Sequence, residues 1–172
     1  MFNLANLENL IDDNTDDLLR LAFYYVKDLQ AAEDIVQDVF IKFYETQNLY
    51  KEQGKLKAYL KKLTVNRSLD YLRSWNYRKV FLQNKLVSLT KGKRSDYLVK
   101  KDEQTLIGDA ILELPLKQRE VLVYFYFEEW TIAEIAAFLA IPQSTVKTRL
   151  RRGKELLRPK LEGIEWEVLM HE

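Results

Sequence analysis

The chain has 172 residues, 47% of them hydrophobic, so it is long enough for one ordinary domain or two small ones with a real core. Five glycines and three prolines are too few for an all-β protein, and the absence of cysteine excludes disulfides, thiol nucleophiles and zinc fingers. No apolar run approaches the roughly 20 residues that span a membrane, and the acidic N-terminus is unlike a signal peptide. The sequence therefore predicts an all-α, cytoplasmic protein without membrane insertion.

The formal net charge of +1 conceals an uneven distribution of charge. Residues 1–34 hold eight acidic side chains and two basic ones, whereas residues 147–160 hold seven basic side chains and one acidic residue, Glu155. Such a distribution suits a chain that offers one surface to nucleic acid and another to a basic protein. Each charged block taken alone is equally consistent with a solvated helix face.

The first predicted helix covers Asn14–Lys27. The acidic residues just before and inside it are interpreted as its start, because the helix dipole favours negative charge at that end. A calcium-binding loop beginning at Asp12 is excluded. Its sixth position, which requires glycine, is Asp17, and its twelfth, which requires glutamate, is Phe23.

A second, amphipathic helix is predicted over residues 28–45. Its apolar stripe includes the i, i+4 series Val36, Phe40 and Tyr44, and its other side is polar. A loop follows over residues 46–55. In it, Tyr50 either folds back onto the core or is available to stack on a nucleic acid base.

Residues 56–79 return to helical spacing and are strongly basic, with Trp75 and Tyr77 near the end. Basic residues mixed with aromatics suit single-stranded nucleic acid, although a solvated basic helix has a similar sequence. Residues 80–105 lose a clear period and are predicted to be a flexible linker. The domains expected are thus residues 1–79 and residues 106–172.

The second domain is expected to hold helices over residues 106–112 and 116–127, and Pro115 marks the start of the latter. A helix-turn-helix is predicted between Thr131 and Lys160. Thr131 and Glu134 form a capping box, T-x-x-E, and Pro142 suits the first position of the next helix. That helix combines an apolar stripe with the dense positive charge, which is the arrangement of a helix that enters a DNA major groove.

Two separated stretches resemble one family. AEDIVQDVFIKFYE followed by AYLKKLTVNRSLDYLRS is similar to the second domain of sigma factors of the extracytoplasmic-function group. LPLKQREVLVYFYFEEWTIAEIAAFLAIPQSTVKTRLRRGKELL resembles their fourth domain, and the two stretches occur in the family's order. The resemblance implies a sigma factor that binds bacterial core RNA polymerase and directs promoter recognition and melting, commonly in response to stress. An anti-sigma factor is the implied regulatory partner, and no cofactor or metal is implied.

The resemblance also implies roles for individual residues. Core polymerase would be bound by Asp34, Gln37 and Asp38. The melted −10 element would be bound by Tyr50, Asn66, Asp70 and Arg73. The duplex −35 element would be bound by Gln143, Ser144, Thr145, Lys147, Thr148, Arg149, Arg151 and Arg152, with Lys147, Thr148 and Arg151 facing bases and the others near phosphates.

Two residues of the helix-turn-helix depart from the family pattern. Ala140 stands in the turn where a glycine is usual, which costs about 1 kcal/mol if its φ is positive. Arg151 stands where some members carry an apolar or aromatic residue, which is consistent with a shifted −35 preference.

Two other functions remain open from the sequence. One is a standalone regulator that uses only the helix-turn-helix, and the other is an interaction protein built from amphipathic helices. An enzyme is not expected, because the chain lacks a nucleophile and base set, a glycine-rich phosphate loop and a paired-carboxylate cleft.

Overall fold

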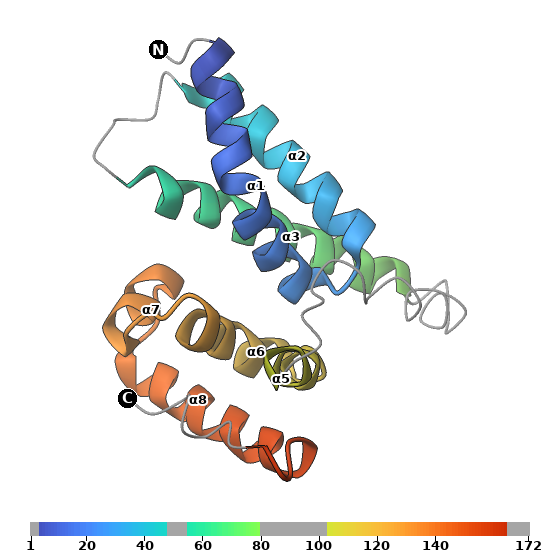
Figure 1. Ribbon diagram of the computed structural model, residues 1–172, viewed down its shortest axis with the longest axis vertical. Coiled ribbons are helices and arrows are strands. Elements are labelled where there is room, and N and C mark those ends of the chain that lie inside the picture. Colours follow the sequence, from blue (N-terminus) through green and yellow to red (C-terminus); the bar gives the residue numbers. More distant parts are fainter. Residues whose placement is uncertain (1–3, 48–54, 80–102, 165–172) are drawn as a thin grey trace. The chain divides into compact units, whose positions relative to one another are not determined.

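Every element in the computed structural model, which describes residues 4–47, 55–79 and 103–164, is helical (Figure 1). The all-α prediction is confirmed for these residues. The chain divides into two compact units, within Met1–Asp96 and Tyr97–Glu172, termed the N-terminal and C-terminal units. Most of the expected linker and Tyr50 lie outside the described residues. No helix among those described is both long and apolar enough to cross a membrane.

The N-terminal unit contains α1 (Leu4–Val26), α2 (Leu29–Thr46) and α3 (Leu56–Lys79), packed against one another (Figure 1). Asp28 caps α2, because its Oδ1 accepts a hydrogen bond from the N–H of Ala31 at 3.0 Å. The buried side of α2 consists of Ala31, Ala32, Ile35, Val36, Val39, Phe40 and Phe43. Tyr44, predicted on this stripe, is exposed instead. Each i, i+4 step turns about 40° around a helix, so the series leaves the core by its third member.

The predicted start of α1 is wrong. The helix runs from Leu4, and the acidic residues interpreted as its first turn lie in its middle. Burial of Leu10 extends the core contact toward the N-terminus. Asn14 is also buried, and its Nδ2 donates to the carbonyl of Leu10 at 2.8 Å, while the Thr15 hydroxyl donates to Ile11 at 2.6 Å. These side chains bond back within the helix and do not cap it.

The C-terminal unit contains α5 (Glu103–Leu112), α6 (Leu116–Leu122), a π-helix (Val123–Phe127), α7 (Ile132–Leu139), α8 (Gln143–Leu157) and a 3₁₀ turn (Arg158–Lys160). The segment expected to be one helix over residues 116–127 therefore changes type after Leu122. The wider turn is seen in the hydrogen bond from the N–H of Glu128 to the carbonyl of Val123, at 3.3 Å.

An aromatic cluster lies beside the π-helix. The rings of Tyr124 and Trp130 stack with centroids 4.9 Å apart, and Phe138 of α7 meets Trp130 edge to face at the same separation. Tyr124 is fully buried. Burial of this ring joins the π-helix to α7, the first helix of the helix-turn-helix.

The first helix of the helix-turn-helix, α7, is capped at both of its ends. The capping box is present: Thr131 Oγ1 accepts from the N–H of Glu134 at 3.2 Å, and Glu134 accepts from the N–H of Thr131 at 2.7 Å. Ala140 ends α7 with φ 54° and ψ 47°, so the positive φ considered from the sequence is present. Pro142, predicted as the first residue of the next helix, is instead the N-cap of α8, one position before its first helical residue, Gln143.

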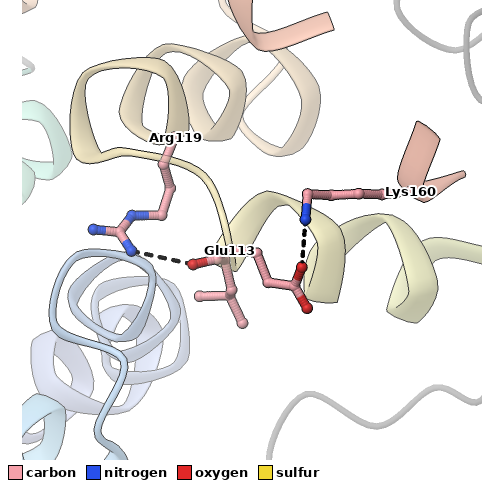
Figure 2. Close-up of polar contacts among 4 residues, drawn as sticks. Glu113, Arg119 and Lys160 are labelled. Atoms are coloured by element: carbon pink, nitrogen blue, oxygen red, sulfur yellow. Dashed lines mark hydrogen bonds and ion pairs between the residues drawn. The ribbon is translucent and has the colours of Figure 1, made fainter. Parts of the chain in front are cut away.

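Two polar contacts hold the end of α5 and the residue that follows it (Figure 2). The buried Arg119 of α6 donates through Nη1 to the carbonyl of Leu112, the last residue of α5, at 3.3 Å. Lys160, after α8, contacts Glu113, after α5, with Nζ and Oε2 separated by 2.6 Å. Leu161 is buried directly beyond Lys160. Residues 158–161, directly after α8, are therefore part of the folded unit.

Candidate nucleic-acid and protein interfaces

The exposed face of α8 is positioned by burial of the opposite face. Ser144, Lys147, Thr148 and Arg151 follow the i, i+3, i+4, i+7 spacing of one helix face, and all four are exposed. The buried side consists of Val146, Leu150, Gly153 and Leu157. The chain thus presents a continuous polar, basic surface on a helix whose rotation is fixed by its core.

Two of the residues predicted to face bases are available for contact. The side chains of Lys147 and Arg151 make no ion pair or hydrogen bond within the described parts of the chain. The Thr148 hydroxyl donates to the carbonyl of Ser144 at 3.0 Å, which still leaves its lone pairs and methyl group outward. Arg152 pairs with Glu155 at 3.2 Å in an exposed contact that is easily exchanged.

Arg149 is placed differently from its neighbours. Its Nη1 lies 3.2 Å from Oε1 of Glu120 on α6, and only 19% of the Arg149 side chain and 12% of the Glu120 side chain are exposed. Removing one member of such a pair leaves the other charge poorly solvated. Arg149 therefore fixes α8 against α6, and the phosphate contact predicted for it stays a prediction.

Gly153 is a second positioning residue that the sequence interpretation missed. A Cβ at this position would lie 2.7 Å from Cδ1 of Leu122, a fully buried side chain of α6. Glycine in a helix interior is unfavourable by about 1 kcal/mol relative to alanine, so its presence indicates a packing reason. The signal was available as a lone glycine inside a strong helical pattern.

The N-terminus of α8 offers fewer free N–H groups than predicted. The N–H of Thr145 donates to the carbonyl of Pro142 at 3.0 Å, and Thr145 itself is half-buried. Gln143 and Ser144 are exposed and hold the outermost N–H groups of the helix. The expected anion contact is therefore confined to the first two residues of α8.

In the N-terminal unit, the polar side of α2 is exposed as predicted, at Asp34, Gln37 and Asp38. Asp38 is also paired inside the unit: its Oδ2 lies 2.9 Å from Nη2 and 3.0 Å from Nε of Arg67 on α3. This pairing was not predicted, because the basic composition of residues 56–79 does not single out Arg67.

The predicted strand-binding residues of α3 share one face. Asn66, Asp70 and Arg73 are spaced i, i+4, i+7, and all three are exposed. Asp70 Oδ1 and Arg73 Nη1 are 2.8 Å apart. The pair places an acid beside a cation, which lowers the repulsion between Asp70 and a nearby phosphate.

Comparison with known proteins matches both units. The model of sigma-70 region 2 matches residues 10–77, and the model of sigma-70 region 4 matches residues 104–157. The RNA polymerase sigma factor SigV of Bacillus subtilis is 32% identical over 157 residues, covering 91% of this chain and 92% of SigV. The ECF RNA polymerase sigma factor SigW of the same organism is 29% identical over 168 residues, covering 91% and 89% of the two chains.

Solved structures agree on the fold. The sigma factor RpoE of Bartonella quintana, crystallised with the anti-sigma factor NepR, gives a TM-score of 0.69 at 19% identity and covers 93% of this chain and 99% of its own. CnrH in complex with the cytosolic domain of CnrY gives a TM-score of 0.64. Because both regions match, the hypothesis of a standalone helix-turn-helix regulator is excluded. The chain belongs to the extracytoplasmic-function group of sigma-70-family RNA polymerase sigma factors, which act in transcription initiation.

Proposed function

We propose that the chain binds a promoter at two elements, the duplex −35 element and the melted −10 element, while α2 binds core RNA polymerase. The observation that carries this proposal is the exposed face of α8, where Lys147 and Arg151 have no partner in the described part of the chain. In this arrangement Lys147, Thr148 and Arg151 read base edges of the duplex −35 element. Lysine and arginine satisfy guanine O6 and N7 in the major groove, and each good base contact discriminates by about 1–3 kcal/mol.

Phosphates of the −35 duplex are met by the flanks of the same helix. Gln143 and Ser144 offer backbone N–H groups at the positive end of the helix dipole. Arg152 supplies a mobile cation once it leaves Glu155. These contacts set the register of the protein on DNA and carry no sequence information, so they make binding fall steeply with salt.

In the N-terminal unit, α3 binds the melted −10 strand. Asn66 offers amide groups to an exposed base edge, and Arg73 meets a phosphate while Asp70 orients it at 2.8 Å. Tyr50, outside the described residues, is the proposed stacking partner for an unpaired base. The chain is a non-enzymatic, cytoplasmic specificity subunit in this proposal.

An anti-sigma factor is the proposed regulator. Both structurally similar proteins named above were solved in complex with another protein, the anti-sigma factor NepR in one case and the cytosolic domain of CnrY in the other. By analogy, a protein that covers α2 or α8 of this chain would block polymerase or promoter binding.

Run-off transcription with bacterial core polymerase and a genomic promoter library tests the whole proposal. The full chain should yield transcripts whose start sites share a −35 and a −10 element. Lys147→Ala and Arg151→Ala should each weaken −35 binding by about 1–3 kcal/mol and relax the base preference at one position. Lys117→Ala, which removes an exposed cation of α6, is the matched control and should change neither.

Polymerase binding is tested separately, by the affinity of the chain for core enzyme. Asp34→Ala and Gln37→Ala should weaken it, and Asp17→Asn on α1 should not. Absence of any promoter-dependent transcript together with absence of binding to core polymerase would refute the proposed function.

A further inference from the structure

The Asp38–Arg67 ion pair joins the two proposed surfaces of the N-terminal unit. Asp38 belongs to the polymerase-binding face of α2, and Arg67 follows Asn66 on the strand-binding helix α3. Both N–H contacts of the pair, at 2.9 and 3.0 Å, end on the same carboxylate oxygen, Oδ2. About half of each side chain is exposed, 45% for Arg67 and 48% for Asp38. The pair is therefore accessible to an incoming partner of either charge.

Arg67 stands between two hollows along the groove between α2 and α3. One hollow, of about 430 Å³, is lined by Asp34, Tyr71 and their neighbours, and the other, of about 360 Å³, by Asp38, Asn66 and Asp70 among others. Arg67 lines both hollows. Its side chain consequently has open space on either side once it leaves Asp38.

The internal Asp38–Arg67 contact competes with any external partner of either side chain. A basic group of a protein partner that binds Asp38 competes with Arg67 for the same carboxylate, and the two cations repel each other. Loss of Asp38 leaves Arg67 as an unpaired cation in the hollow that Asn66 and Asp70 also line. A guanidinium in that position is suited to a phosphate of the strand bound by those residues.

We propose that the Asp38–Arg67 pair is a latch that couples polymerase binding to −10 strand binding. Polymerase occupies Asp38 and releases Arg67, which then becomes an additional strand contact. The latch rests on the proposed function, because it assumes that α2 binds polymerase and that α3 binds DNA. By linkage, Arg67 bound to DNA favours polymerase at Asp38 by the same factor.

The test measures binding of the free chain to a labelled single-stranded oligonucleotide that carries the mapped −10 sequence. Asp38→Asn keeps the side-chain shape and removes the charge, so it should raise the affinity about two- to fivefold, the range that an exposed ion pair supplies. The same substitution in an Arg67→Gln background should give no increase. Asp17→Asn, which breaks the exposed Asp17–Arg20 pair of α1 with the same change in net charge, is the control and should leave affinity unchanged.

Binding to core polymerase gives the second readout. Arg67→Gln should tighten it up to about fivefold, because Asp38 is then available without competition. A weaker complex would mean that Arg67 only positions Asp38, and would overturn the latch. So would an oligonucleotide affinity that stays unchanged in Asp38→Asn or rises equally in Asp17→Asn. Failure of the proposed function is distinguishable, since Asp38→Asn would then leave core binding unaltered.

Discussion

Replacement of Ala140 by glycine is expected to stabilise the C-terminal unit. Ala140 holds φ 54° and ψ 47°, where the Cβ of an L-residue crowds the following carbonyl at a cost of about 1–2 kcal/mol. Glycine removes this cost, but its greater conformational freedom lowers the free energy of the unfolded chain by about 0.4–1 kcal/mol. Ala140 is exposed, so no core contact is lost. The net gain in the free energy of unfolding is about 0.5–1 kcal/mol.

Ala137→Gly supplies a control of identical chemistry and opposite sign. Ala137 is exposed inside α7 with ordinary helical geometry, so glycine there should cost about 1 kcal/mol. Ala140 lies in a Schellman motif, with the N–H of Ile141 bonded to Ala136 at 3.1 Å and the N–H of Ala140 bonded to Ala137 at 3.4 Å. Both backbone bonds survive either substitution, so the two variants differ mainly in local φ.

Urea denaturation, monitored by the fluorescence of Trp130, measures the difference in the free energy of unfolding between these variants. Trp130 stacks on Tyr124 inside the C-terminal unit, and replacement of Trp75 and Trp166 by phenylalanine makes it the one tryptophan reporter. The midpoints of Ala140→Gly and Ala137→Gly should move in opposite directions with unchanged slopes. If Ala140→Gly lowers stability as much as Ala137→Gly does, the strain assigned to this turn does not exist.

Three further substitutions in α8 follow from its packing. Arg149→Met should lower the free energy of unfolding by about 1–3 kcal/mol, because a mostly buried partner carboxylate loses its cation. Arg151→Met should change stability by less than about 0.5 kcal/mol, and equal losses in the two variants would contradict the placement of Arg149. Gly153→Ala should cost about 1–3 kcal/mol by overpacking despite its better helix propensity. Combining it with Leu122→Ala should recover part of that loss in a double-mutant cycle, and a purely additive result would exclude the clash.

Strong helical period and capping chemistry were sufficient to predict several elements. The bounds of α3 and the capping box of α7 agree with the sequence interpretation, because both depend on residues close together in the chain. The start of α1 was wrong because the helix dipole argument considered only local charge. Burial of Leu10 against the other helices outweighed it and placed the acidic residues mid-helix.

The π-helix could not be predicted from period. The sequence VYFYF is apolar at every position, so it carries no signal that separates a 3.6-residue turn from a wider one. The wider turn accompanies burial of Tyr124 against Trp130 and Phe138, which follow it in the chain. Contacts of this kind form only after the flanking helices have packed.

The candidate surfaces were predicted better than the ion pairs within them. Helical spacing alone places Asp34 and Lys147 on exposed faces, and both are exposed. The pairs that Asp38 and Arg149 form join residues 29 positions apart on separate helices. Their formation depends on how each helix is rotated about its axis, which sequence periodicity fixes only to within one face. The same rotation decides which cations are available to DNA.

The ion pair between Lys160 and Glu113 bears on the design of any fragment of this protein. The region 4 match ends at residue 157, yet Lys160 holds the α5–α6 turn at 2.6 Å and Leu161 is 3% exposed. A fragment that ends at residue 157 would lack the buried side chain of Leu161. It would also lack the Lys160 contact to Glu113, which precedes α6. A fragment meant to contain the C-terminal unit should therefore include Leu161.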